Sequence, residues 1–205
     1  MESKRSILHS RRHGIVLAAF ALLVTLALAI AQFVTKDRIH DNERNRVQST
    51  LAEVLPKHSY DHPLEDNSIE IFDQIANRYR TCYVASRNGK PVAIIITATA
   101  ADGYSGDIEM LVGILADGTI SGVRVTKHSE TPGLGDAIEV QRSAWIKSFD
   151  GKSRTVPAES RWTVKKHNGE FDQFTGATIT PQAVVIEVQN TLQFFETVKP
   201  QLFNL

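Results

Sequence analysis

The residues best suited to chemistry lie near the C-terminus, in the segment DQFTGATITP at positions 172–181. This segment places threonine hydroxyls directly before an expected helix, because Thr180 suits an N-cap and Pro181 suits the first helical position. The N-terminus of a helix presents unpaired N–H groups and partial positive charge, which favour phosphate. Gly176 and Ala177 would let a bulky group approach the backbone. The segment therefore predicts a phosphate site beside hydroxyl groups, although an ordinary capped helix shows the same spacing.

A second segment, HSETPGLGD at positions 128–136, contains a tight turn. Pro132 and Gly133 suit the two central positions of a type II turn. Asp136 is then predicted to begin a helix, with Glu139 as its capping-box partner. The turn is either a plain surface feature or a loop whose glycines expose backbone N–H and C=O groups to a ligand.

Together the two segments resemble motifs of the FMN-binding domain family. Residues 172–178 resemble its flavinylation motif, Asp-x-x-Thr-Gly-Ala-Thr, and residues 128–135 resemble its His-x-Glu-Thr-Pro-Gly-Leu-Gly loop. The DGYSG sequence at 102–106 and Trp145 also fit. The short chain with an N-terminal apolar segment is most similar to the RnfG family, the G-type subunits of Rnf ion-translocating electron-transport complexes. The C-type subunit of the sodium-pumping NADH:quinone reductase is a similar but usually longer relative. The resemblance extends from about Tyr83 onward.

The resemblance implies a covalent flavoprotein. A separate flavin transferase would join FMN to Thr178 through a phosphoester. The other implied cofactor-binding residues are Thr175, Gly176, Ala177, Thr180, Thr131, Gly133 and Leu134. The implied function is that of one member of an ion-translocating oxidoreductase complex, which relays electrons through FMN among other subunits and has little turnover alone. Two alternatives stay open: the C-type role in the sodium-pumping reductase, and a non-redox anchored periplasmic binding module.

No catalytic side chain is predicted, because a flavin carries electrons itself. His128 and Glu130 would share one face of a strand and form either an acid–base pair or part of a solvated rim. Tyr104 and Trp145 would either stack near the flavin or belong to the core.

Composition excludes several other functions. The 205 residues include 23 basic and 23 acidic side chains, and no basic block interleaved with aromatics predicts nucleic-acid binding. The single cysteine, Cys82, rules out an internal disulfide, an iron–sulfur cluster or a cysteine zinc site, and it is expected to be buried in a strand. His58 and His62 are four residues apart, but Pro56 and Pro63 argue against the helix that a metal-binding pair would need.

Near the N-terminus, residues 15–34 are apolar except for Thr25 and Gln32, and about 20 such residues match the thickness of a bilayer core. Four basic residues before position 13 favour a cytoplasmic N-terminus, although further basic residues follow the apolar run. The predicted organisation is a cytoplasmic N-terminus at 1–13, a single transmembrane anchor at 14–34, a juxtamembrane helix and loop at 35–80, and a periplasmic FMN-binding domain at 81–205. The protein would then lie in a bacterial inner membrane. A cleaved signal peptide is the alternative, because residues 29–31 read Ala-Ile-Ala.

The elements that would position the two motifs indicate an α+β domain with an antiparallel sheet and packed helices. Asn88-Gly89 and Asp117-Gly118 are strong hairpin signals, which predict strands at 81–86, 91–100, 108–114 and 119–126. The second of these is expected to be central and buried, and Gly122 is expected to mark a bulge.

Helices are predicted before and after these strands in the sequence. One covers residues 36–55 and carries an apolar stripe of Val47, Leu51, Val54 and Leu55. Another covers 136–149, and a C-terminal helix carries Val184, Val188, Leu192 and Phe195 on one face. Residues 58–67 are predicted to form a loop, and residues 161–166 a short edge strand.

Overall fold

The computed structural model describes residues 17–18, 20–26, 32, 49–55 and 59–203. The chain divides into two compact units, Met1–Val47 and Gln48–Leu205. In the first unit the described residues are helical, and none of the described helices is long and apolar enough to span a membrane. The rest of the predicted anchor and residues 1–13 lie outside the described residues.

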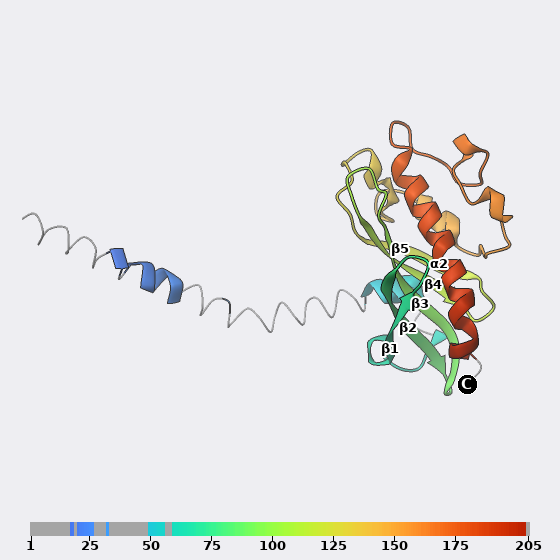
Figure 1. The fold of residues 1–205 in the computed structure, drawn as a ribbon, viewed down its shortest axis with the longest axis horizontal. Helices are drawn as coiled ribbons and strands as arrows, with labels where there is room; N and C mark the ends of the chain where they lie inside the picture. The colour runs from blue at the N-terminus through green and yellow to red at the C-terminus, as the bar shows by residue number, and fades with distance from the viewer. Residues whose placement is uncertain (1–16, 19, 27–31, 33–48, 56–58, 204–205) are drawn as a thin grey trace, which may run out of the picture. The chain divides into compact units, whose positions relative to one another are not determined.

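The second unit is built on a five-stranded antiparallel sheet in the order β1-β2-β3-β4-β5, so each strand pairs with its neighbours in the sequence (Figure 1). The strands are β1 (Ser68–Asp73), β2 (Arg78–Arg87), β3 (Lys90–Ala100), β4 (Ile108–Leu115) and β5 (Ile120–Lys127). This confirms the predicted α+β class and antiparallel sheet. In such a meander β3 and β5 run in the same direction, so the loops that follow them leave the sheet at one end.

Both predicted hairpins are present. Asn88 and Gly89 have φ angles of 53° and 72°, the left-handed pair that a type I′ turn requires between β2 and β3. Gly118 has φ 93° and turns the chain between β4 and β5. The predicted bulge lies beside Gly122, where the pairing moves from Gly113–Gly122 to Ile114–Ile120.

The long helix α2 (Ile179–Phe203) packs against β3 and β4 (Figure 1). Its predicted apolar face of Val184, Val188, Leu192 and Phe195 is buried, as expected. Its later turns reach the β4–β5 hairpin, because a Cβ on Gly118 would lie 3.8 Å from Cε1 of Phe195. The first turn of α2 therefore lies at the other end of the sheet, where the loops after β3 and β5 emerge.

A second helical segment, residues 49–54, contacts the sheet through Val54. Gly113 and Gly122 pair across β4 and β5, and a Cβ on Gly113 would lie only 2.5 Å from Cγ1 of Val54. The two glycines thus leave room for this side chain. Leu51, Val54 and Leu55 are buried, which confirms that part of the predicted stripe, whereas Val47 lies outside the described residues.

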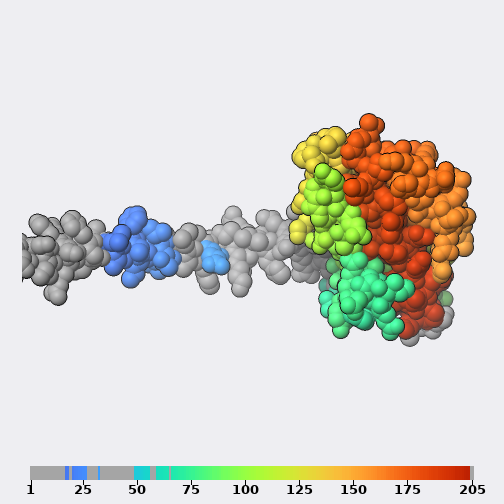
Figure 2. Space-filling model, turned by 45° about the horizontal axis from the view of Figure 1, so that its top comes forward, coloured from blue at the N-terminus to red at the C-terminus, as the bar shows by residue number. Residues whose placement is uncertain are grey.

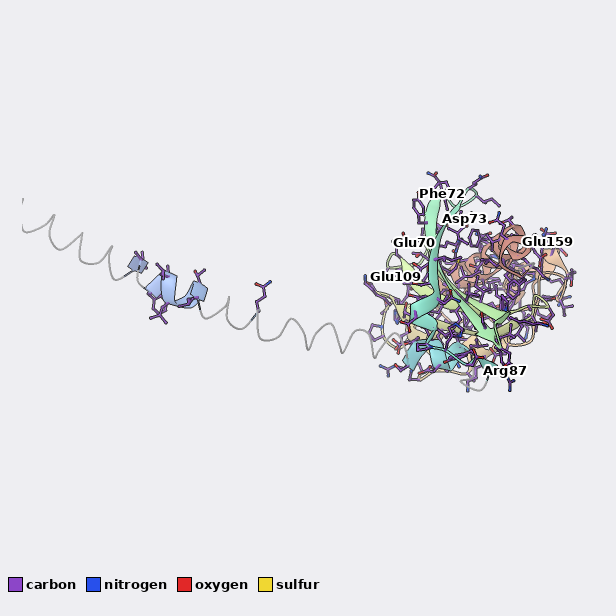
Figure 3. The ribbon with its side chains drawn as sticks, turned by 90° about the horizontal axis from the view of Figure 1, so that it is seen from below. Glu70, Phe72, Asp73, Arg87, Glu109 and Glu159 are labelled. Atoms are coloured by element: carbon purple, nitrogen blue, oxygen red, sulfur yellow. The ribbon has the colours of Figure 1, made fainter. Side chains whose placement is uncertain are left out.

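A buried charge network joins α2 to the edge of the sheet. The Arg80 guanidinium lies 2.7 Å from Asp73 and 2.8 Å from Glu187 of α2, and all three side chains are buried. Asp73 follows Phe72 at one end of β1 (Figure 3). The pairing satisfies charges that would be costly to bury alone.

Two predicted elements are wrong. The helix expected at 136–149 is replaced by two short 3-10 helices, η3 (Gly135–Ile138) and η4 (Trp145–Phe149). The capping box does not form, because the Asp136 carboxylate accepts a hydrogen bond from the upstream Gly133 N–H and the Glu139 carboxylate lies against His128.

In place of the edge strand at 161–166, the chain forms η5 (Glu159–Arg161) and η6 (Lys165–His167), with a single bridge from Val164 to Phe171. Packing of aromatic rings holds this irregular region. Phe149 stacks on Phe171 at a centroid distance of 4.6 Å, and Trp162 lies against both rings. The strand β1 and the 3-10 helix η2 (Leu64–Asn67) before it have no counterpart in the sequence-based prediction.

Candidate functional site

The two sequence motifs meet at a cavity of about 220 Å³ at the end of the sheet where the loops after β3 and β5 emerge. Its lining residues are Tyr104, Glu130, Thr131, Leu134, Gly135, Gly176, Ala177, Thr178, Ile179 and Thr180. Figure 2 shows the corresponding light green, yellow and orange-red segments close together on the surface of the domain. Thr175 and Gly133 are exposed and lie outside this lining.

Two tight turns of the same kind face each other at this cavity. In the first, the Leu134 N–H donates to the Thr131 carbonyl at 3.1 Å and Gly133 has φ 80°, as the predicted type II turn requires. In the second, the Ala177 N–H donates to the Phe174 carbonyl at 3.1 Å and Gly176 also has φ 80°. A Cβ on Gly176 would lie 3.7 Å from Cδ2 of Leu134, so the turns approach closely.

The helix start differs from the prediction by two residues. The Gln182 N–H donates to the Thr178 carbonyl at 3.3 Å, which makes Thr178 the N-cap of α2 and places Pro181 at the third helical position. An N-cap oxygen usually accepts from the N–H of the second or third helical residue. Proline has no N–H, and within the described part of the chain the Thr178 hydroxyl makes no hydrogen bond. The half-buried Thr178 thus presents an uncommitted hydroxyl at a helix N-terminus.

The other threonines of the motif are placed differently. Thr180 is fully buried, and its hydroxyl donates to Oε2 of Glu130. Thr175 is exposed in the turn and is not part of the cavity wall. Thr178 therefore combines an accessible hydroxyl with a position in that wall.

Glu130 is the main departure from the sequence-based expectation. Its side chain is buried, with 4% of the residue exposed, so the solvated-rim interpretation is wrong for it. Oε1 accepts a hydrogen bond from the Ser105 N–H at 2.9 Å, and Oε2 accepts from Thr180. No local pattern could reveal this burial, because both partners come from distant segments of the chain.

His128 does not form an acid–base pair with Glu130. Its Nε2 lies 2.8 Å from Oε1 of Glu139, and its Nδ1 accepts a hydrogen bond from the Glu130 backbone N–H at 3.0 Å. Both ring nitrogens are thus engaged in holding the loop.

The two aromatic residues that could stack near a flavin differ in their exposure to solvent. Tyr104 is 69% exposed and lines the cavity, whereas Trp145 is buried in the core. The Trp145 indole N–H donates to the Asp172 carbonyl at 2.8 Å, and its ring meets Phe174 edge-on at 5.1 Å. Trp145 therefore anchors the segment that carries the second turn.

A neighbouring hollow of about 340 Å³ shares Thr178 and Ile179 with the cavity and is also lined by Lys166 and His167. Lys166 adds a positive charge beside the start of α2, and Asp102 lines the same hollow with a carboxyl group. Elsewhere, burial raises the pKa of the Cys82 thiol to about 12, which makes it unreactive. Among the described residues no cluster of side chains could hold a metal ion.

Comparison with known proteins agrees with the geometry. Residues 1–54 match the family model of the RnfG N-terminal region, and residues 103–193, which include both turns and Thr178, match the FMN-binding domain. Over 196 residues the chain is 42% identical to the G-type subunit of the ion-translocating oxidoreductase complex of Vibrio vulnificus, covering 95% of this chain and 93% of the relative.

Two further relatives have the same name. The Photorhabdus laumondii protein is 44% identical over 200 residues, which cover 95% of this chain and 94% of the relative. The Pseudomonas aeruginosa protein is 43% identical over 203 residues, which cover 98% and 94%. The chain therefore belongs to the RnfG family, the G-type subunits of ion-translocating oxidoreductase complexes.

Proposed function

We propose that this protein is a membrane-anchored flavoprotein subunit that relays electrons within an ion-translocating oxidoreductase complex, through FMN attached to Thr178. Membership of the RnfG family and the match to an FMN-binding domain support an FMN-binding subunit of such a complex. They favour this role over the C-type role in the sodium-pumping reductase. The main support for the attachment site is the Thr178 hydroxyl. Within the described part of the chain it makes no hydrogen bond, and Thr178 lies in the cavity wall where both motif turns meet.

The residues around Thr178 fit the phosphoryl end of FMN. The first turn of α2 supplies backbone N–H groups and partial positive charge, and Lys166 and His167 line the hollow that Thr178 shares. Gly176 and Ala177 themselves place no large side chain beside Thr178. A negatively charged phosphoester would therefore be stabilised here without a buried counter-ion.

The cavity fits only part of the cofactor. Its volume of about 220 Å³ is below the roughly 300–1,000 Å³ typical of pockets that enclose a whole ligand. A covalent bond removes the need for full enclosure, because a tethered group stays at high effective concentration. The backbone of the Thr131, Gly133 and Leu134 turn would then contact one edge of the ring, with Tyr104 on the exposed side.

Bound FMN supplies the electron-carrying isoalloxazine, and the chain holds and orients it. Thr178 would provide the attachment, the N–H groups at the start of α2 would stabilise the phosphoryl charge, and the two turns would border the ring. The electrons would pass to and from other subunits of the complex, and this transfer would be coupled to ion translocation. A flavin transferase would install the FMN, and the domain would face the periplasm from the inner membrane.

The experiment replaces the hydroxyl and keeps the shape of the side chain. Full-length protein is made in a host that contains the flavin transferase, and peptides across residues 171–181 are analysed by mass spectrometry. Native protein should carry FMN on Thr178, and Thr178→Val should carry none while it still folds, because losing one unengaged hydroxyl costs on the order of 1 kcal/mol or less.

Thr175→Val is the matched control, since it removes an exposed hydroxyl from the same motif and should keep the FMN. Thr180→Val is a second control that also removes the hydrogen bond to Glu130, so it should keep the linkage at reduced yield. FMN retained in Thr178→Val, or mapped to another threonine, would disprove the attachment site. Native protein without flavin would instead support a non-redox binding module.

A further inference from the structure

We propose that Glu130 lowers the reduction potential of the flavin by placing a buried negative charge at the flavin site. This inference rests on the proposed function and adds a residue that tunes the cofactor. Of the ten residues that line the cavity, all within the described part of the chain, Glu130 alone carries a charged side chain. It lies three residues after the end of β5 at Lys127, directly before the turn that begins at Thr131.

Two hydrogen bonds fix the position of the Glu130 side chain. Both oxygens accept: Oε1 from the Ser105 N–H and Oε2 from the Thr180 hydroxyl. None of the ion pairs among the described residues includes Glu130. The buried charge is thus held by neutral donors alone, in contrast to Glu187, which pairs with Arg78 and Arg80.

The backbone around the carboxylate is shaped to admit it. A Cβ on Gly135 would lie 2.8 Å from Oε2, and a Cβ on Gly103 would lie 3.0 Å from Oε1. Such distances are too short for any larger residue at either position without movement of the carboxylate. The loop after β3, the loop after β5 and the first turn of α2 therefore converge on one carboxylate that lines the cavity.

A fixed negative charge in this position has a defined electrostatic effect. Each electron accepted by a flavin adds one negative charge unless a proton follows, and a nearby carboxylate raises the free energy of that reduced form. Because the side chain is buried, solvent and salt screen the interaction weakly. Charge near the ring is one of the means by which a protein tunes a flavin, so the potential should be more negative than without Glu130.

Glu130→Gln tests this, since it removes the charge and keeps the shape. The Gln carbonyl can still accept from Ser105, and the Thr180 hydroxyl can reverse its role and accept from the Gln amide. In the full-length protein, FMN should still be attached, and the potential measured by spectroelectrochemistry with small-molecule mediators should shift to a more positive value. Thermal unfolding of the protein before FMN attachment checks that the variant folds.

Two further variants separate charge from packing. Glu109→Gln removes a carboxylate that is 47% exposed and outside the cavity lining, so its potential should equal that of the native protein. Glu130→Asp keeps the charge and changes the packing, so its potential should stay closer to the native value than that of Glu130→Gln.

A folded, flavin-bearing Glu130→Gln protein with the native potential would overturn the inference and leave the proposed function intact. A shift in Glu130→Asp as large as that in Glu130→Gln would also overturn it, because the effect would then follow packing. Absence of FMN from the native protein would be a failure of the proposed function itself. In denaturant all variants should show one common potential, since the tethered flavin then leaves the cavity.

Discussion

At the start of α2, Thr178 and Thr180 of the 172–181 motif differ in the hydrogen bonding of their hydroxyl groups. Thr180 is buried and bonded to Glu130, whereas Thr178 occupies the N-cap with its hydroxyl unengaged. Pro181 contributes to this state, because it removes one of the two N–H groups that usually donate to an N-cap oxygen. A residue that suits a helix start thus leaves the hydroxyl of Thr178 without a hydrogen bond.

Pro181→Ala should restore that donor. The new N–H at the third helical position would bond the Thr178 oxygen and stabilise the helix by about 1 kcal/mol. The same bond must be broken before the oxygen can react, so attachment of FMN should slow by about fivefold, the factor that 1 kcal/mol represents. The initial rate of FMN incorporation with purified transferase measures this.

Pro200→Ala, near the other end of α2, is the matched control and should leave the rate unchanged. A Pro181→Ala protein that incorporates FMN at the native rate would show that the free hydroxyl at the cap does not limit the reaction.

Among the secondary-structure elements, α2 and the β1–β2 hairpin depend on one another through the buried network at Arg80. Burial alone would raise the pKa of Asp73, but the Ala76 N–H and the Arg80 guanidinium lower it overall, below its usual value of 3.8. A group whose pKa is lowered on folding stabilises the protein above its unfolded pKa. That contribution is lost as the pH falls through the folded pKa.

Asp73→Asn should therefore destabilise the protein at neutral pH and have less effect in acid. The variant leaves Arg80 with Glu187 as its remaining carboxylate, which predicts a loss of about 3 kcal/mol near pH 7. The difference in unfolding free energy from the native protein should shrink as the pH falls below the usual carboxyl pKa of 3.8. Urea unfolding at several pH values measures this difference.

Glu70→Gln, on the same strand but exposed, is the control and should show neither effect. If the unfolding free energy of Glu70→Gln depended on pH in the same way as that of Asp73→Asn, the acid sensitivity would not be specific to the Arg80 network.

The predictability of these elements follows from how local their determinants are. The turns at Asn88-Gly89 and Pro132-Gly133 are predictable because glycine and asparagine tolerate positive φ whatever surrounds them. The absence of a helix at 136–149 is not predictable from the sequence. Asp136 and Glu139 bind Gly133 and His128 instead of capping a helix. The burial of Glu130 depends on two distant loops, which no spacing rule contains.

For the molecule as a whole, the meander explains how two motifs about 40 residues apart share one cavity. Because β3 and β5 run in the same direction, the loops carrying Tyr104 and Thr131 leave the sheet at one end, where α2 also begins. The region between β5 and α2 has little regular structure, yet its aromatic packing and the Trp145 bond to Asp172 return the chain to that end. The N-terminal side of the same unit is fixed by Val54 against Gly113 and Gly122.

The remaining prediction concerns how the chain is placed across the membrane. The apolar run at 15–34 is long enough to span a bilayer, and the basic residues before it favour a cytoplasmic N-terminus. Alkaline phosphatase, which is active only in the periplasm, and a fluorescent protein that matures only in the cytoplasm are fused separately to Leu205. The phosphatase fusion should be active and the fluorescent fusion dark.

The same pair of reporters fused after Arg12 is the control and should give the opposite pattern, because that point precedes the apolar run. N-terminal sequencing of the membrane-bound protein separates an anchor from a signal peptide. An N-terminus at Met1 supports the anchor, whereas a mature N-terminus near Gln32 would show that the segment is removed. Fluorescence from the Leu205 fusion without phosphatase activity would contradict a periplasmic domain. An electron relay through Thr178 would then have to operate on the cytoplasmic side of the membrane.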